Sequence, residues 1–213
     1  MFDLLKEDIQ AIKDRDPAAK SSLEILLLYP GLKAVRMYRR AHKHYLKGHS
    51  FRARYISQKA ARKTGIEIHP GATIGRRLVI DHGTGIVIGE TTEIGDDVLI
   101  YQGVTLGGTG KDVGKRHPTI GNRVMISAGS KVLGPIKIGD DSRVAAGAVV
   151  LKDVPPNSTV VGVPAHIVRK NGKKVEANPL DQIHIPDPVQ LEIDNLNKRI
   201  KTLEEQLKEQ THK

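Results

Sequence analysis

The sequence predicts a mainly β fold: a left-handed parallel β-helix, preceded by an α-helical cap and followed by a coiled-coil helix. Three observations predict it. Large aliphatic residues recur at every sixth position through the middle of the chain, whereas the first 64 positions follow helical spacing and a heptad pattern stands near the end. Only 3% of the residues are aromatic, so the core must be aliphatic, which suits tight β-helical coils.

The repeat of six is the strongest of these signals. One large apolar residue per six is typical of a parallel β-helix, in which each unit forms one flat side of a triangular coil. The aliphatic side chains stack inside, while glycines and small residues turn the corners. The column comprises Ile68, Ile74, Ile80, Ile88, Ile94, Ile100, Leu106, Ile120, Ile126, Val132, Ile138, Val144 and Val150.

Two breaks in this repeat indicate where function lies. Eight positions separate Ile80 from Ile88, two too many, and fourteen separate Leu106 from Ile120, eight too many. A solenoid core cannot absorb extra residues, so we expect them to form loops, where function is usually found. Both breaks contain a histidine beside charged residues and glycines, within 81–85 and 107–118.

The flanking regions complete the expected organisation. Residues 1–64 should form the helical cap that the first coil of a solenoid needs, 65–170 the β-helix, and 171–188 a linker. Residues 189–209 carry a heptad seam, and a helix so short is expected to associate with copies of itself. The alternative is an amphipathic helix folded back on its own domain. The seam consists of Val189, Ile193, Leu196, Ile200, Leu203 and Leu207.

Composition narrows the function classes. The chain has no cysteine, which excludes disulfides and thiolate chemistry and fits a cytoplasmic protein. We find neither a signal peptide nor a run long enough to span a bilayer, so no membrane association is expected. A net charge of +10 invites a nucleic-acid hypothesis, but Lys and Arg are scattered and no aromatic-interleaved groove is visible. A solvated cationic surface is the first explanation for the positive charge, and a phosphate-bearing cofactor is the next.

Several motifs resemble those of one enzyme family. From about residue 3 to 170 the chain is similar to the short form of serine O-acetyltransferase. The resemblance implies transfer of acetyl from acetyl-CoA to the L-serine hydroxyl, giving O-acetylserine for cysteine biosynthesis. The motifs that carry it are Asp8–Ala11, Arg15–Ala18, Ile66–Ala72, Ile80–Gly85, Gly89–Thr91, Gln102–Lys111, Lys115–Pro118 and Gly162–Ala165.

His82 is the expected general base. A serine hydroxyl attacks a thioester only as its proton is removed, and imidazole has a suitable pKa for this at neutral pH. By resemblance an acidic residue orients the histidine, and the matching position is Glu67, where many family members carry Asp. Because the chain offers no cysteine or other obvious covalent acceptor, direct transfer is expected rather than an acyl-enzyme.

The resemblance also assigns binding residues for both reactants. Serine is a zwitterion: Asp16 and Asp81 should face its ammonium, while Arg116 binds its carboxylate with help from His117. For acetyl-CoA, the backbone N–H groups of a glycine-rich loop, a groove beside small residues, and a basic residue near the nucleotide phosphates are expected. These are Gly107, Gly108 and Thr109, then Ala128 and Ala146, and Arg143.

No metal is expected. His69, His82 and His117 could be imagined as a zinc triad, as in β-helical carbonic anhydrases, but no acidic second shell accompanies them.

Partners and alternatives follow from the same comparison. The long form of the family has extra N-terminal helices that join two trimers, and this chain begins inside that region, so we expect a homotrimer. Feedback inhibition by L-cysteine in the serine site is implied. A complex with O-acetylserine sulfhydrylase is doubtful, because the chain ends Thr211-His212-Lys213 rather than in the isoleucine used for that docking. The alternatives are acetylation of another hydroxyl or amine, a non-catalytic scaffold presenting the tail, and a nucleic-acid binder.

Overall fold

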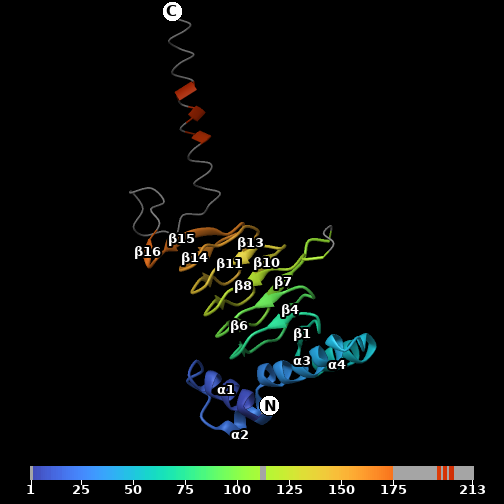
Figure 1. Cartoon of the computed structure of the whole chain (residues 1–213). Helices are drawn as coiled ribbons and strands as arrows, with labels where there is room; N and C mark the ends of the chain where they lie inside the picture. The colour runs from blue at the N-terminus through green and yellow to red at the C-terminus, as the bar shows by residue number, and fades with distance from the viewer. Residues whose placement is uncertain (1, 111–113, 175–195, 198, 201, 204–213) are drawn as a thin grey trace, which may run out of the picture. The chain divides into compact units, whose positions relative to one another are not determined.

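The computed structural model describes residues 2–110, 114–174, 196–197, 199–200 and 202–203 (Figure 1). The chain divides into two compact units, Met1–Val175 and Glu176–Lys213. Most of the predicted heptad helix and linker lies outside the described residues. Of the tail, residues 196–197, 199–200 and 202–203 are helical, and Leu196, Ile200 and Leu203 are exposed.

Four helices precede the first strand. Pro30 begins the third of them at a position where its missing N–H costs nothing, and Gly65 ends the fourth with a left-handed φ of 71°. The first ends just before the Arg15-Asp16-Pro17 turn, as the proline predicts. The helices are α1 (Phe2–Lys13), α2 (Ser22–Leu28), α3 (Pro30–Leu46) and α4 (Ser50–Thr64).

The predicted parallel β-helix is confirmed, with about five turns. Its strands form three sheets, all paired in parallel within the coils. Sheet A contains β1 (Ile66–Ile68), β4 (Ile86–Ile88), β7 (Thr105–Gly107), β10 (Lys131–Leu133) and β13 (Val149–Val150). Sheet B contains β2 (Thr73–Ile74), β5 (Glu93–Ile94), β8 (Thr119–Ile120) and β11 (Lys137–Ile138). Sheet C begins with β3 (Val79–Asp81), β6 (Leu99–Tyr101), β9 (Met125–Ile126) and β12 (Arg143–Val144).

The end of the coil departs from the repeat. Sheet C continues through β14 (Ser158–Val161), which pairs in parallel with β12, and then through β15 (His166–Lys170) and β16 (Lys173–Lys174). These last two strands pair antiparallel, each with the strand before it. The hairpin covers the last strand of this sheet, which would otherwise present unpaired backbone groups.

Strand register locates the two insertions. Ile88 pairs with Leu106, eighteen positions on, which is the length of three six-residue units. Ile68 pairs with Ile88, twenty positions on, and Ile94 pairs with Ile120, twenty-six positions on. The first coil therefore holds two extra residues and a later one holds eight, at the breaks that the sequence predicts.

The core is the predicted aliphatic column. Every member is buried except Ile74, which is partly buried and packs against the others. A second column four positions later is also buried, at Thr92, Val98, Val104, Val124, Ser130 and Ala148.

Each coil turns three corners, and the site is best described by them. The His82 corner joins sheet C to sheet A and comprises 82–85, 102–104, 127–130 and 145–148. The Arg116 corner joins sheet A to sheet B and comprises 69–72, 89–92, 108–110 with 114–118, and 134–136. The ladder corner joins sheet B to sheet C and comprises 75–78, 95–98, 121–124 and 139–142.

The helices pack on the first coils (Figure 1). Ile12, Ile25 and Leu32 form one apolar cluster with Val79 of β3, and Leu99 of β6 packs against it. On the other side, the Tyr38 hydroxyl donates to the Ala72 carbonyl and the Ser57 hydroxyl to the Ile68 carbonyl at 2.7 Å. These contacts satisfy backbone groups of the first coil and fix the turn after α1 beside β3.

Candidate active site

His82 follows β3 directly, at the first inserted residue pair. Its backbone has a left-handed φ of 58°, and Gly83 and Gly85 continue with φ of 80° and 78°. This tight turn leaves the His82 side chain 76% exposed, with Nε2 3.9 Å from Oδ1 of Asp81, the last residue of β3. An accessible imidazole beside a carboxylate is suited to exchange a proton with a bound reactant.

Asp16 lies close to Asp81, although it comes from the cap. Both residues line a small pocket between the turn after α1 and the first strands of sheet C. The Asp16 carboxylate accepts hydrogen bonds from the Tyr29 hydroxyl and from the Ala18 backbone N–H, each at 2.8 Å. The remaining lining residues are Ile12, Arg15, Tyr29, Val79, Ile80 and Leu99. Two carboxylates in one pocket favour a cationic group.

Glu67 occupies the middle of β1, between the buried Ile66 and Ile68, so its side chain points outward on sheet A. It pairs with Val87, just beyond the His82 turn. Among the described residues, the Glu67 carboxylate accepts a hydrogen bond only from Gln58, at 3.5 Å. Its orientation of the His82 ring stays a prediction.

The second inserted loop is folded back by Thr91. The Thr91 hydroxyl oxygen accepts from the backbone N–H of Arg116 at 3.0 Å and of His117 at 3.1 Å. Gly89 is required beside it, because a Cβ there would lie 1.9 Å from Cδ2 of His117. Arg116 donates from Nη2 to Glu90 Oε2 at 2.6 Å, and Tyr45 donates to the other Glu90 oxygen at 3.2 Å.

The charge state of this corner follows from these contacts. The hydrogen bond from Arg116 is the main reason that the pKa of Glu90 is lowered. Burial, reinforced by the positive charge of Arg116, lowers the pKa of His117. Its Nδ1 accepts from the Thr91 backbone N–H at 3.3 Å, so the neutral ring carries its proton on Nε2. The corner therefore offers a guanidinium and an imidazole N–H, which together suit a carboxylate.

The structure divides the predicted serine-binding residues into two groups. Asp16, Asp81 and His82 gather at the His82 corner, and Arg116 and His117 gather at the Arg116 corner. Because sheet A separates these corners, one chain does not bring the two groups together.

The predicted acetyl-CoA residues are divided in the same way. Ala128 and Ala146 stack at the His82 corner, where the Gly147 N–H donates to the Ala128 carbonyl at 2.9 Å. Arg143 is exposed at the start of β12. Gly107 ends β7 in sheet A, and a Cβ at Gly108 would lie 3.1 Å from Nε2 of His117. Thr109 is exposed in the loop that follows.

The described residues hold no group of three or more His, Cys, Asp or Glu that could bind a metal ion. Of the three histidines considered for zinc, His117 lies at the Arg116 corner, as does His69, whose Nδ1 accepts from the Gly71 N–H at 3.0 Å. His82 lies at a different corner.

Sequence reasoning gave no role to Tyr29, Glu90 or Thr91. Glu90 and Thr91 stood in a family motif, but their contacts join residues 25 or 26 positions apart. These contacts become visible only after the eight inserted residues are removed from the repeat. Tyr29 left no local signal beyond its place before Pro30.

Two family models match the chain. One is described as "Serine acetyltransferase, N-terminal" and matches residues 1–37; the other, "Bacterial transferase hexapeptide (six repeats)", matches 117–152. None of the described helices has the length and apolar character needed to cross a membrane.

Relatives and solved structures agree with these models. A serine acetyltransferase of Bacillus subtilis (strain 168) is 53% identical over 98% of this chain and 95% of its own length. One of Staphylococcus aureus (strain N315) is 52% identical over 94% of this chain and 93% of its own. The Neisseria gonorrhoeae enzyme in complex with serine has a TM-score of 0.76 at 43% identity, covering 79% of this chain and 69% of that one. The Brucella abortus enzyme in complex with coenzyme A has a TM-score of 0.78 at 46% identity, covering 79% and 68%. The chain belongs to the serine acetyltransferase family.

Proposed function

We propose that this protein transfers the acetyl group of acetyl-CoA to the hydroxyl of L-serine, giving O-acetylserine, the activated precursor of cysteine. The observation that carries this proposal is the exposed His82 beside a pocket that contains Asp81 and Asp16. Relatives described as complexes with serine and with coenzyme A support the same pair of reactants. We also propose a cytoplasmic location, which the lack of cysteine fits.

His82 acts as the general base. Its imidazole takes the hydroxyl proton as the serine oxygen attacks the thioester carbonyl, forming a tetrahedral intermediate. The carbon–sulfur bond then breaks, and the imidazolium returns the proton to the leaving thiolate of CoA. The reaction is a direct transfer with no acyl-enzyme, and Glu67 orients the His82 ring from the adjacent face of sheet A.

The two charged groups of serine are recognised at different corners. Asp16 and Asp81 bind the ammonium, which matches the two carboxylates in the pocket. Arg116 binds the carboxylate with the part of its guanidinium not used by Glu90, and His117 donates from Nε2. L-cysteine carries the same ammonium and carboxylate, so it competes for this site as a feedback inhibitor.

A homotrimer completes the site. Since one chain holds the two halves at separate corners, a threefold arrangement brings the His82 corner of one copy against the Arg116 corner of the next. Acetyl-CoA then lies between copies, along Ala128 and Ala146 on one side and the Gly107–Thr109 loop on the other. Arg143 meets the nucleotide phosphates.

The activity is tested by measuring acetyl-CoA consumption against a panel of acceptors. We expect rapid consumption with L-serine and little with amino sugars, aminoglycosides or other amino acids. Preferred acetylation of another hydroxyl or amine would replace serine as the substrate. If no acceptor in the panel is acetylated, the result would favour the non-catalytic scaffold.

The shared site is tested by mixing two inactive variants. His82→Ala and Arg116→Ala each disable every site of their own trimer. In randomly reassembled mixtures, about one quarter of the sites combine an intact His82 corner with an intact Arg116 corner. Activity should therefore reappear on mixing, at a mass corresponding to three chains. Mixtures that stay inactive, or a monomeric or hexameric mass for the active protein, would contradict the trimer.

A further inference from the structure

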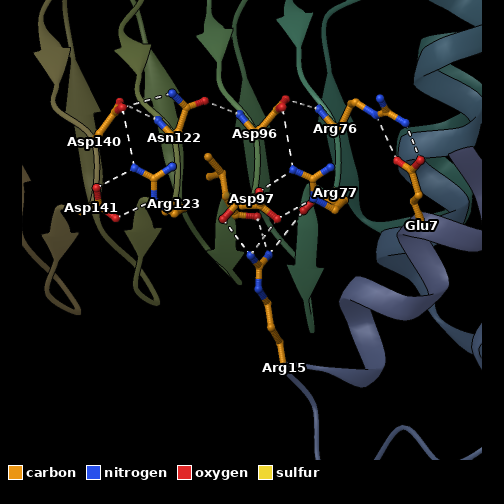
Figure 2. A network of polar contacts seen from close by, with 11 residues as sticks. Glu7, Arg15, Arg76, Arg77, Asp96, Asp97, Asn122, Arg123, Asp140 and Asp141 are labelled. Carbon is orange, nitrogen blue, oxygen red and sulfur yellow. Dashed lines mark hydrogen bonds and ion pairs between the residues drawn. The ribbon is translucent and has the colours of Figure 1, made fainter.

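Arg15 ties the cap to the β-helix at the residue before Asp16. Its Nη2 donates to the Asp97 carbonyl at 2.8 Å, and its Nη1 donates to the carbonyls of Arg77 at 3.3 Å and Val98 at 3.4 Å. The same guanidinium lies 3.6 Å from Oδ1 of Asp97. Figure 2 shows the side chain reaching from the end of α1 to this part of the ladder corner.

Asp97, which Arg15 contacts, is itself held in place by Arg77. Arg77 donates to both oxygens of Asp97, at 2.7 and 2.5 Å. The pKa of Asp97 is lowered, mainly by this pair and further by the charge of Arg15. Arg15 therefore contacts one carboxylate and three carbonyl oxygens, which belong to two successive coils. A planar guanidinium with several N–H donors can reach all of them at once, whereas the compact ammonium of lysine cannot.

Tyr29 fixes the carboxylate itself. One Asp16 oxygen accepts from the Ala18 N–H and the other from the Tyr29 hydroxyl, so the carboxylate cannot rotate without breaking a hydrogen bond. The hydrogen bond to Asp16, followed by burial, raises the pKa of Tyr29 to about 12. The hydroxyl thus stays a donor throughout the pH range in which an acetyltransferase is assayed.

We propose that Arg15 and Tyr29 are positioning residues for serine: Arg15 docks the turn that carries Asp16 onto the β-helix, and Tyr29 aims the Asp16 carboxylate into the pocket it shares with Asp81. The inference rests on the proposed function, in which these carboxylates bind the serine ammonium. Asp81 is carried by β3 and Asp16 by the cap, so their spacing depends on how the two are held together.

The test compares Tyr29→Phe and Arg15→Met with matched controls. Tyr55→Phe removes an exposed hydroxyl from α4, and Arg123→Met removes a guanidinium that pairs with Asp141 at the same corner without touching the cap. Arg15→Lys serves as the milder second variant if Arg15→Met folds poorly. For each protein, KM is measured for serine and for acetyl-CoA, together with kcat, Tm and the selectivity for serine over 3-hydroxypropionate, which lacks the ammonium.

We expect Tyr29→Phe and Arg15→Met to raise KM for serine by about tenfold or more, since each loses a hydrogen bond that involves a charged group. KM for acetyl-CoA and kcat should change less than about threefold, and the selectivity for serine over 3-hydroxypropionate should fall as the serine KM rises. The controls should match the parent protein in both KM values, in kcat and in selectivity. Unchanged serine KM and selectivity in the two variants, or equal rises for both substrates, would overturn the positioning role while leaving serine acetylation in place. A parent protein that does not acetylate serine would overturn the proposed function instead.

Discussion

The ladder corner and the His82 corner repeat in every coil, yet they treat polar side chains in opposite ways. At the ladder corner, the polar residue after each glycine bonds the next coil: the Arg76 N–H donates to Asp96, the Asp96 N–H to Asn122 and the Asn122 N–H to Asp140, at 2.7 to 2.9 Å (Figure 2). At the His82 corner, His82 is 76% exposed. A polar side chain with a counterpart in the next coil is used for stability, and one without a counterpart is free for chemistry.

Backbone conformation shows the same contrast. In every coil, these two corners place at least one residue at positive φ, which costs a residue with a Cβ roughly 1–2 kcal/mol. The His82 corner uses Gly85, Gly103, Gly129 and Gly147 there. The ladder corner uses charged residues, which form ion pairs between coils that offset this cost; they are Arg77, Asp97, Arg123 and Asp141. Only at the inserted pair does the His82 corner put a non-glycine residue, His82 itself, in this conformation.

The largest expected effect of this contrast is on catalysis. His82→Ala should lower kcat by about 10²- to 10⁴-fold, because the proposed general base is lost, while Tm should stay the same because the side chain is exposed. The matched control is His166→Ala, which removes an exposed histidine from β15. Steady-state kinetics and thermal melts check both variants. Turnover of His82→Ala within a fewfold of the control would reject His82 as the base.

A substitution at the ladder corner should have the opposite effect, lowering stability without changing catalysis. Asn122 lies at its centre, accepting from the Asp96 N–H at 2.9 Å and donating to Asp140 at 3.1 Å. Asn122→Ala removes two hydrogen bonds of about 1 kcal/mol each. Tm should therefore fall by roughly 4–8 °C, with kcat unchanged. Gln10→Ala, which loses only an exposed hydrogen bond to Asp14 just after α1, should leave both values unaltered. A large loss of kcat in Asn122→Ala would mean that the two corners are not independent.

The repeat made the fold predictable to the level of single residues. A large aliphatic residue every six positions can be satisfied only by a coil with that period, and the registers of β1 with β4 and of β5 with β8 place the extra residues at the two predicted breaks. The same reasoning missed β15 and β16, because an antiparallel hairpin obeys no repeat of six.

The site was predictable only in part, because its contacts cross between elements. His82 could be singled out because it lies at a break in the repeat, whereas Arg116, at the second break, was assigned by the resemblance to the family. The contacts around Asp16 could not be predicted: Arg15 reaches the Asp97 carbonyl only when the cap has docked on sheet C, and Tyr29 reaches Asp16 across thirteen positions within the cap. Docking of the cap is a tertiary contact and produces no periodic pattern in the sequence, whereas the stacking of coils requires an aliphatic residue at every sixth position.

The smallest expected effect is on the pH dependence of stability, and it separates the Arg116 corner from the ladder. Burial lowers the pKa of His69 and His117 in the fold, whereas the unfolded chain keeps the ordinary histidine value of about 6.5. Below pH 6.5 the unfolded chain therefore binds protons that the folded chain does not, and stability falls as the pH falls. The ladder carboxylates behave differently. Arg77 and Arg123 lower the pKa of Asp97 and Asp141, so the stability that these carboxylates contribute is complete above the ordinary carboxyl pKa of about 3.9 and is lost as the pH falls from there through the lowered pKa values.

Thermal melts between pH 8 and pH 3 should accordingly show two declines. The first decline, a fall in Tm of a few degrees between pH 7 and pH 5, is caused by protonation of His69 and His117. The second, below about pH 4, includes protonation of the carboxylates at the ladder corner. His117→Gln keeps a neutral polar side chain and should flatten the first decline while leaving the second in place. Arg123→Met should weaken the second alone, because it removes the partner of Asp141. If His117→Gln and Arg123→Met altered the same part of the curve, the corners would not be separate electrostatic units, and the division between a catalytic and a structural edge of the coil would fail.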